Sequence, residues 1–294
     1  MDGLDQYRLD KGRARRDFNG AAHAYEDTAV LQHTVSERLI ERLDLIAMQP
    51  GRVLDLGSGT GMAARKLAQL YRKPRIIQAD FAVNMLSTAR RHASLIFSRH
   101  CFVCADAEQL PLADAGIDLV FSSLMLQWCS EPARVFQEVG RILSPGGLFI
   151  FSSLGPDTLH ELRDSWRSVD DGIHVHAFID MHDLGDVLMH SGFEHPVMET
   201  EYFVLTYQDV FALMRDLKQL GANNVNLDRR RTLTGKGRLE AMVSEYEKTR
   251  RAGRLPATYE VIYGHAWKRN QGGPSAGDAA PVMVPISSIR RRKP

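Results

Sequence analysis

The sequence predicts an α/β protein built around a mostly parallel, doubly wound sheet. From residue 52 onward, apolar runs of strand length alternate with segments of helical periodicity. Such alternation is typical of parallel strands whose connecting helices cover both faces of a sheet. The chain of 294 residues is 44% hydrophobic and 25% charged, as in an ordinary globular domain. No apolar run approaches the roughly 20 residues of a membrane span, so we expect a soluble protein.

The expected strands and helices follow one another in regular order. The predicted strands are apolar or alternating runs and cover residues 53–56, 75–80, 101–106, 117–123, 147–154, 197–205 and 259–267. The predicted helices have apolar residues three and four apart and cover residues 61–70, 83–93, 132–143 and 180–192. In a sheet of this kind, ligands bind at the carboxyl ends of the strands.

A short helix with an arginine on its apolar face is predicted directly after the fifth strand. Thr158 and Glu161 have the spacing of a capping box, which starts a helix. Arg163 then lies on the same stripe as Leu159 and Trp166, the face that a helix normally turns toward the core. Because an unpaired buried charge is costly, we expect an acidic partner for Arg163.

The last two predicted strands are separated by about fifty residues, too many for a plain hairpin loop. Helical periodicity in 209–222 and 237–253 predicts an inserted helical lid over residues 206–255. We expect a single domain over residues 1–268, with an N-terminal helical lead in 1–50. Residues 269–294 are rich in Gly, Pro, Ala and Ser and are predicted to form a disordered tail.

A glycine loop, GSGTG, connects the first predicted strand to the first helix after it. Gly57, Gly59 and Gly61 let the backbone pass close to a ligand. A dinucleotide-binding G-x-G-x-x-G would need glycine where Met62 stands. Asp55 precedes the loop, where a carboxylate would disfavour a pyrophosphate but suits an ammonium group. The loop alone would fit a tight turn as well as a ligand site.

Two further acids end neighbouring strands. Asp80 ends the second strand, where it suits ribose hydroxyl groups, and Asp106 ends the third, where it suits an adenine amino group. Since the carboxyl ends of parallel strands meet at one edge, these acids and the glycine loop are expected to lie together. The combination favours a nucleoside ligand that also bears an amino group.

This arrangement resembles the class I S-adenosylmethionine-dependent methyltransferases, whose motifs are D-L-G-x-G-x-G and an acid after each of strands two and three. The resemblance implies a Rossmann-like fold with a seven-stranded, mostly parallel sheet and a reversed terminal hairpin. It also implies S-adenosyl-L-methionine as the cofactor and S-adenosyl-L-homocysteine as its product. The residues that it places around the cofactor are Asp55, Gly57, Ser58, Gly59, Gly61, Asp80, Phe81, Met85, Asp106 and Ala107.

Longer segments outside the glycine loop narrow the resemblance. They include DKGRARRDFNGAAHAYEDTAVLQ, LPLADAGIDLVFSSLMLQW, FSSLGPDTLHELRDSW, HVHAFIDMHDLGDVLMHSGF, LMRDLKQLGANN and LPATYEVIYGHAW. Residues 11–268 thus resemble the malonyl-acyl-carrier-protein O-methyltransferases, which begin pimeloyl synthesis for biotin. The resemblance implies methylation of the free carboxylate of a malonyl thioester on acyl carrier protein, giving the methyl ester that primes this synthesis. A carboxylate is already ionised at neutral pH, so the reaction needs no general base.

Three residues are candidates for the substrate side of the site. Arg163 is expected to hold the malonyl carboxylate, and a structural ion pair with a nearby acid is the alternative. Tyr25 is expected to cover the cofactor and bond the same carboxylate, and a core tyrosine is the alternative. His176 is expected near the pocket, where it bonds either the substrate or Asp180.

Metal and redox chemistry are not expected. His174 and His176 lie two apart, with His182 and His190 further on, but no Cys, Asp or Glu completes a convincing ligand set. Methyl transfer needs no metal, so none is assigned.

The three cysteines do not form a disulfide framework. Cys101 and Cys104 make a C-x-x-C in a predicted strand, where residues three apart point to opposite faces. Together with Cys129 they suit a reducing compartment, and we expect a cytoplasmic protein.

The distribution of charge indicates a partner. The net charge of +1 argues against a dominant nucleic-acid surface. The lid is basic, however, with eleven Lys or Arg against six Asp or Glu in residues 206–255. An acidic carrier protein would be attracted to such a surface. The expected docking residues are Arg215, Lys218, Arg229, Arg230 and Arg231.

Two other functions remain open at this point. A carboxyl methyltransferase acting on malonyl-coenzyme A or on a small dicarboxylic acid would have a similar site. An assembly factor resembling the protein-arginine hydroxylase of respiratory complex I would keep the same fold but yield no methyl ester.

Overall fold

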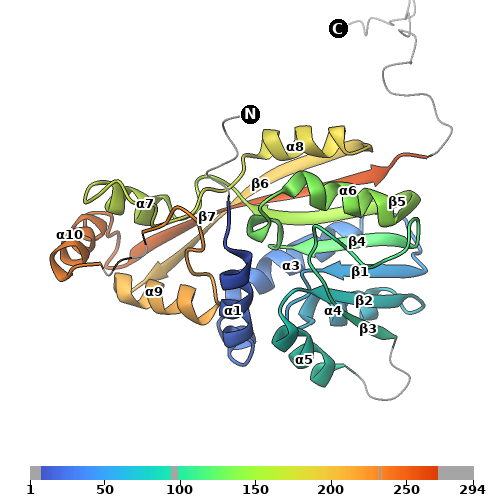
Figure 1. Ribbon diagram of the computed structural model, residues 1–294, viewed down its shortest axis with the longest axis horizontal. Coiled ribbons are helices and arrows are strands. Elements are labelled where there is room, and N and C mark those ends of the chain that lie inside the picture. Colours follow the sequence, from blue (N-terminus) through green and yellow to red (C-terminus); the bar gives the residue numbers. More distant parts are fainter. Residues whose placement is uncertain (1–7, 94–98, 231, 233, 271–294) are drawn as a thin grey trace, which may run out of the picture.

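The computed structural model describes residues 8–93, 99–230, 232 and 234–270. Within these residues, seven strands form one sheet in the order β3-β2-β1-β4-β5-β7-β6 (Figure 1). The strands are β1 (Arg52–Leu56), β2 (Arg75–Asp80), β3 (His100–Cys104), β4 (Ile117–Ser123), β5 (Leu143–Leu154), β6 (Phe193–Tyr207) and β7 (Leu255–Lys268). The predicted α/β class is confirmed.

The helices precede the sheet, connect its strands and form the insertion before β7. They are α1 (Lys11–Ala21), α2 (Tyr25–Thr28), α3 (Val30–Leu43), α4 (Met62–Leu70), α5 (Val83–His92), η2 (Leu126–Trp128), α6 (Pro132–Ile142), α7 (His160–Arg167), α8 (Met181–His190), α9 (Val210–Gln219) and α10 (Lys236–Glu247). Figure 1 shows α7, α9 and α10 gathered around one end of the long β6–β7 hairpin, and α5 beside β2 and β3.

The directions of the strands show at which edge of the sheet a ligand would bind. β1 pairs in parallel with β2 and β4, and the outer pairs β2–β3 and β4–β5 are also parallel. β7 runs antiparallel to both β5 and β6, which confirms the reversed terminal hairpin. The carboxyl ends of the five parallel strands therefore meet at the edge where the glycine loop begins.

Apolar side chains cover both faces of the sheet. On one face, residues of α3, α4, α7, α9 and α10 share a core with β-strand residues such as Phe121 and Ile150. On the other face, α6 and α8 pack against Phe149 and Phe151, whose rings stack at a centroid distance of 4.8 Å. This two-sided burial explains why the central strands are continuous apolar runs.

The last two strands are longer than the sequence predicted. β6 begins at Phe193 and β7 at Leu255, because their antiparallel pairing continues to Tyr207 opposite Leu255. Both α9 and α10 fall within the predicted insertion. Of the predicted tail, residues 271–294 lie outside the described residues. Among the helices of the described chain, none has the length and hydropathy needed to cross a bilayer.

Candidate active site

A cavity of about 620 Å³ lies along the carboxyl edge of the sheet. Its lining comes from the glycine loop and the ends of the parallel strands, from the N-terminal helices, and from the lid helix α9. Segments distant in sequence therefore meet at one place, where the parallel strands end. This is the position at which the fold binds ligands.

The three glycines of the loop have different structural tasks. All three have positive φ, 75° at Gly57, 52° at Gly59 and 78° at Gly61. A Cβ on Gly57 would lie 2.3 Å from Cγ of Met125, and one on Gly61 would lie 2.4 Å from the side chain of Gln78. A Cβ on Gly59 would meet nothing within 4 Å. Gly57 and Gly61 thus permit close packing beneath the loop. Gly57 and Gly59 both line the cavity, and Gly59 leaves space for a ligand.

Asp80 fixes the loop and lines the cavity. Its Oδ2 accepts a hydrogen bond of 2.9 Å from the Gly59 N–H, and its Oδ1 accepts one of 2.8 Å from the Ala82 N–H. Burial raises the pKa of Asp80 to about 6, although these backbone donors oppose the shift. The Phe81 N–H is a third backbone donor, which leaves one of the about four lone-pair sites of the carboxylate for a ligand hydroxyl.

Asp55 lies outside the cavity lining, and the cofactor contact expected of it stays a prediction. The residue is 1% exposed and accepts a bond from the Ala64 N–H at the start of α4. Burial raises the pKa of Asp55 to about 7, and the nearby Asp80 adds to the shift. The next residue, Leu56, lines the cavity instead, because successive strand residues point to opposite faces. Ser58 and Gly61 also lie outside the cavity lining.

Replacing Asp55 with asparagine is expected to stabilise the protein at pH 8. The folded-state pKa of about 7 exceeds the usual 3.8, so the folded state binds this proton more tightly than the unfolded state. The contribution of Asp55 to stability therefore falls as the pH rises from about 4 to about 7. Asparagine keeps an acceptor for Ala64 without the buried charge, which is worth up to about 4 kcal/mol. Thermal unfolding should give a higher Tm for the variant at pH 8, and an equal or lower Tm there would contradict this account.

The third strand end is closed by the N-terminal helix. Asp106, Ala107, Phe81 and Met85 line the cavity as expected. Asp106 is paired, since the Nζ atom of Lys11 lies 2.7 Å from its Oδ2 and 2.6 Å from Oε2 of Glu108.

An aromatic contact continues this closure. Phe18 lies on the same face of α1 as Lys11, two turns further along. Its ring packs edge-on against that of Trp128 with a centroid distance of 4.9 Å, and both rings line the cavity. We did not predict Lys11 or Phe18 as site residues. The sequence feature that could have indicated them is their spacing of seven residues, which places both on one face of the helix.

The helix α1 is also joined to the segment that follows α9. The Asp10 N–H donates to the Val225 carbonyl at 2.8 Å, and the Leu227 N–H donates to the Arg8 carbonyl at 3.0 Å. The side chain of Asn223 donates to Asp17 at 3.0 Å. The end of the cavity at the glycine loop and the end at α9 therefore share one continuous cover.

Tyr25 and His176 both line the cavity. Burial and the charge of Asp80 raise the pKa of Tyr25, so its hydroxyl is neutral. His176 is 6% exposed, and burial lowers its pKa to about 4, which leaves the ring neutral at pH 7. The ring bonds the side chain of Asn224, while its Nδ1 has no hydrogen-bond partner among the described residues.

Asp180, one of the two partners expected for His176, is occupied elsewhere. Its Oδ1 accepts from the backbone N–H of His182 at 2.7 Å and lies 2.8 Å from the ring Nδ1 of the same residue. His176 instead makes edge-on ring contacts with Trp128 and Phe178, each with a centroid distance of 5.3 Å.

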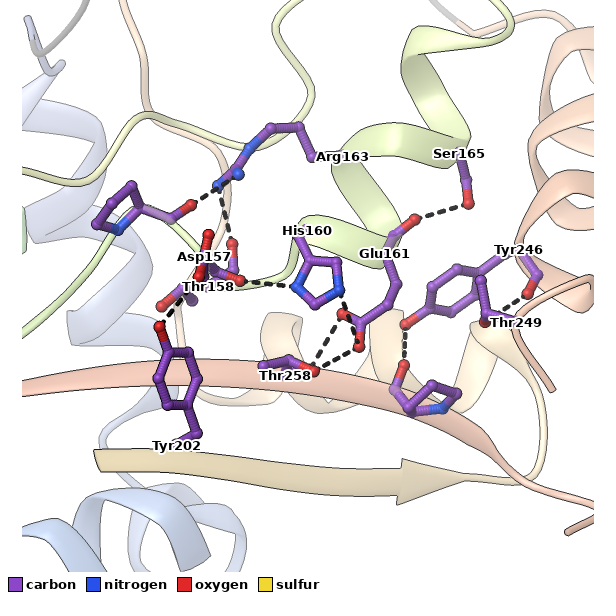
Figure 2. Close-up of polar contacts among 12 residues, drawn as sticks. Asp157, Thr158, His160, Glu161, Arg163, Ser165, Tyr202, Tyr246, Thr249 and Thr258 are labelled. Carbon is purple, nitrogen blue, oxygen red and sulfur yellow. Dashed lines mark hydrogen bonds and ion pairs between the residues drawn. The ribbon is translucent and has the colours of Figure 1, made fainter. Parts of the chain in front are cut away.

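Arg163 bonds the loop before its own helix (Figure 2). Its Nη1 donates to the Pro156 carbonyl at 2.7 Å and its Nη2 to the Thr158 carbonyl at 2.8 Å. Both of these bonds go to main-chain oxygens and not to a side-chain carboxylate, so they do not support the alternative of a structural ion pair, and the role of Arg163 in holding the malonyl carboxylate stays a prediction. Arg163 is half-buried and lies outside the cavity lining, although Thr158, Leu159 and Leu162 of the same segment belong to it.

The capping box predicted for this helix is also wrong. The helix begins at His160, after Leu159 with φ 54°. Glu161 accepts from the Thr258 N–H at 3.1 Å, and the Thr158 hydroxyl donates to the Glu260 carbonyl at 3.2 Å. Both side chains therefore anchor the segment to β7 instead of capping the helix, and Figure 2 shows the contact between Glu161 and Thr258.

The histidines are not gathered around one point. The ring of His174 stacks on Trp166 with a centroid distance of 3.8 Å, and its Nε2 lies 2.7 Å from Oδ1 of Asp170. His182 and His190 bond atoms of their own helix region. Across the described ranges, no group of three or more His, Cys, Asp or Glu could hold a metal ion. The three cysteines, all within these ranges, are free thiols.

The cations expected to dock a carrier differ in their surroundings. Arg229 has an 11% exposed side chain and donates to the Asn226 carbonyl at 2.8 Å. Arg230 lies 3.8 Å from Asp170. Arg215 and Lys218 are exposed on α9, and Lys218 also lines the cavity. Arg231 lies outside the described residues.

Comparison with known proteins identifies the family. Residues 54–151 match the family described as "Methyltransferase domain". The malonyl-acyl-carrier-protein O-methyltransferase of Methylovorus sp. (strain MP688) is 50% identical over 269 residues, covering 90% of this chain and 91% of that protein. The relative of the same name from Halorhodospira halophila (strain DSM 244 / SL1) is 43% identical and covers 100% of both chains.

Solved structures agree with the fold. The YcgJ protein from Bacillus subtilis has a TM-score of 0.59 at 14% identity, covering 81% of this chain and 99% of that chain. A chain from the complex between the Haloferax volcanii Trm112 methyltransferase activator and a methyltransferase has a TM-score of 0.56 at 18% identity, covering 89% and 100%. At such identities the structures support the class I methyltransferase fold alone. The sequence relatives show that the chain belongs to the malonyl-acyl-carrier-protein O-methyltransferase family.

Proposed function

We propose that this protein transfers the methyl group of S-adenosyl-L-methionine to the free carboxylate of malonyl-acyl carrier protein. The observation that carries the proposal is one cavity lined both by the cofactor-type residues Gly59, Asp80 and Asp106 and by Tyr25 and His176. The names of relatives that match nearly the whole chain support the substrate. The product primes pimeloyl synthesis, and the free thiols fit a cytoplasmic location.

The residues present fit the cofactor. The space beside Gly59 is open, since a Cβ there would meet no atom within 4 Å. Asp80 and Asp106 line the cavity with carboxylates that can accept hydrogen bonds. When bound, S-adenosyl-L-methionine supplies a methyl group activated by a sulfonium. A malonyl oxygen forms the new C–O bond as the C–S bond breaks, and the electron pair remains on sulfur. The products are the malonyl methyl ester and S-adenosyl-L-homocysteine, and no proton is released.

The neutral side chains suit this chemistry. Since the acceptor is already an anion, the protein has to align it and exclude water. Tyr25 and the neutral His176 can bond the acceptor without adding a full charge that would withdraw electron density from the attacking oxygen. The two residues are therefore our candidates for orienting the carboxylate.

Incubation with S-adenosyl-L-methionine and malonyl-acyl carrier protein tests the function directly. Mass spectrometry of the carrier should show an added methyl group that alkaline hydrolysis removes. The preference for the carrier is measured by comparing kcat/KM for malonyl-acyl carrier protein with kcat/KM for malonyl-coenzyme A. A higher kcat/KM for malonyl-coenzyme A would favour a small-molecule methyltransferase. The absence of any methyl ester would contradict the proposed reaction.

For Arg163 we propose that it holds one oxygen of the malonyl carboxylate, which leaves the other oxygen to attack the methyl group. Two of its five N–H donors bond the loop, which leaves donors for a ligand. Its charge also acts on His176, a cavity-lining residue. Arg163→Lys removes the planar fork, so we expect kcat/KM for the malonyl substrate to fall by about tenfold or more with an unchanged cofactor Kd. Arg167→Lys, on the exposed face of the same helix, is the control, and normal turnover in Arg163→Lys would defeat the assignment.

For carrier docking we propose the exposed cations of α9. Changing Arg215 and Lys218 together to glutamate should raise the KM for malonyl-acyl carrier protein about tenfold at low salt, because like charges would then meet. The effect should shrink as ionic strength increases. Lys236→Glu is the matched control, since this lid residue has an 89% exposed side chain on α10. Equal effects in both variants, or none, would remove α9 as the docking surface.

A further inference from the structure

Two leucines at the active site adopt a backbone conformation that is unusual for their size. In the described chain, five residues other than glycine have positive φ, namely Ala115, Leu124, Leu159, His195 and Ala252. The two leucines have φ values of 51° and 54°, in the left-handed region that a bulky residue rarely adopts. Both line the cavity, whereas the other three residues do not.

Hydrogen bonds from neighbouring strands hold both leucines in place. The Leu124 N–H donates to the carbonyl and to the hydroxyl of Ser152, each at 3.1 Å. The Leu159 N–H donates to the Thr258 carbonyl at 2.7 Å. Ser152 belongs to β5 and Thr258 to β7, so the central sheet maintains the strained conformation. Such strain persists only where the surrounding structure imposes it, and it concentrates at functional sites.

The leucines lie where the acceptor must approach the cofactor. Leu124 follows the end of β4, next to Met125, which packs under Gly57. Leu159 follows the end of the neighbouring strand β5 and precedes α7. They are 8% and 6% exposed, so each presents only a small apolar surface to the cavity.

We infer that Leu124 and Leu159 are specificity-determining residues that restrict the acceptor to a short, unbranched acyl group. This inference rests on the proposed function. A side chain on a backbone fixed by the sheet cannot withdraw to admit extra atoms, since close-packed interiors transmit such strain. One additional methyl group at an apolar wall changes selectivity by about 10- to 200-fold. The corresponding rejected acceptor is methylmalonyl, which branches at the carbon beside the reacting carboxylate.

The test compares kcat/KM for malonyl- and methylmalonyl-acyl carrier protein in the wild type and in Leu124→Ala and Leu159→Ala. We expect the wild type to prefer malonyl by at least about tenfold, and each variant to reduce this ratio severalfold. Leu39→Ala is the control, because Leu39 is fully buried in the same core cluster but lies outside the cavity lining. It should leave the ratio unchanged.

A second comparison measures the strain itself and does not depend on turnover. Leu159→Gly and Leu159→Ala both remove the side chain, but only glycine adopts φ 54° without penalty. The glycine variant should therefore have a Tm about 2–4 °C above that of the alanine variant. Equal Tm values would show that position 159 is not strained.

The possible outcomes separate the inference from the proposed function. If the wild type methylates malonyl-acyl carrier protein but the acceptor ratio is the same in all variants, the specificity role is wrong while the function stands. If Leu39→Ala changes the ratio as much as Leu159→Ala, the effect is one of general stability and the role is again wrong. If the wild type methylates neither acceptor, the proposed function fails and the inference fails with it.

Discussion

Gly57→Ala is expected to abolish cofactor binding and methyl transfer. The added Cβ would lie 2.3 Å from Cγ and 2.5 Å from Cβ of Met125, atoms too close to the main chain to move aside cheaply. The residue would also keep a positive φ of 75° that alanine tolerates poorly. The loop must therefore shift, and Gly59 with its bond to Asp80 shifts with it. Isothermal titration with S-adenosyl-L-homocysteine should show at least about a hundredfold loss of affinity.

The matched control for this variant is Gly192→Ala. Gly192 has a φ of 84°, but a Cβ there would meet nothing within 4 Å, and the residue lies outside the cavity lining. It should lose about 1–2 kcal/mol of stability from backbone strain and retain cofactor affinity. Near-normal affinity in folded Gly57→Ala would show that the loop is not the cofactor site.

Asp80→Asn should weaken cofactor binding by about ten- to a hundredfold. The carboxylate accepts from two backbone N–H groups, at Gly59 and Ala82, whereas asparagine has only one acceptor oxygen and turns a donor toward the other N–H. Losing one bond to a charged acceptor costs about 1.5–3 kcal/mol. The wild-type affinity should also fall below about pH 6, where Asp80 takes up a proton. This pH dependence should be absent from the variant.

Asp118→Asn provides the control for that change. Oδ2 of Asp118 also accepts from two backbone N–H groups, those of Gly51 and Arg52, at 2.8 and 2.9 Å. Asp118 is the second residue of β4, at the amino end of this strand, and lies outside the cavity lining. Because both donors reach the same oxygen, asparagine can keep both bonds there, and the variant should retain its cofactor Kd with only a small loss of stability. Equal weakening of cofactor binding in both variants would mean that the effect of Asp80→Asn is not specific to the site.

The sequence was sufficient to predict the sheet and the cofactor edge. Strand and helix periods alternate regularly, and acids such as Asp80 and Asp106 end successive parallel strands, so their meeting at one edge follows from topology. The antiparallel terminal hairpin came from the family resemblance, because periodicity does not reveal strand direction. Which strand residue faces the cavity depends on the alternation of side chains, and Leu56 lines the cavity whereas Asp55 lies outside its lining.

The substrate side was less predictable for a different reason. The partners of Arg163 are carbonyl oxygens, whose positions depend on the backbone turn at Leu159 and not on any residue type. Charge counting identified a basic lid, but it could not show that Arg229 lies 4.0 Å from Asp10, far away in sequence. Long-range pairing of this kind is set by tertiary contacts alone.

The hydrogen bonds between α1 and the segment after α9 have a kinetic consequence. Lys11 and Phe18 close the cofactor end, while Asp10 is bonded to Val225 beyond the lid helix. A movement of α1 that lets the spent nucleoside escape must therefore break contacts that also hold the acceptor side shut. The release of S-adenosyl-L-homocysteine and the release of the methyl ester would thus both depend on the same movement of α1. The cycle time of the enzyme would then be set by how often this shared cover opens, a step that is commonly slower than chemistry in closed active sites.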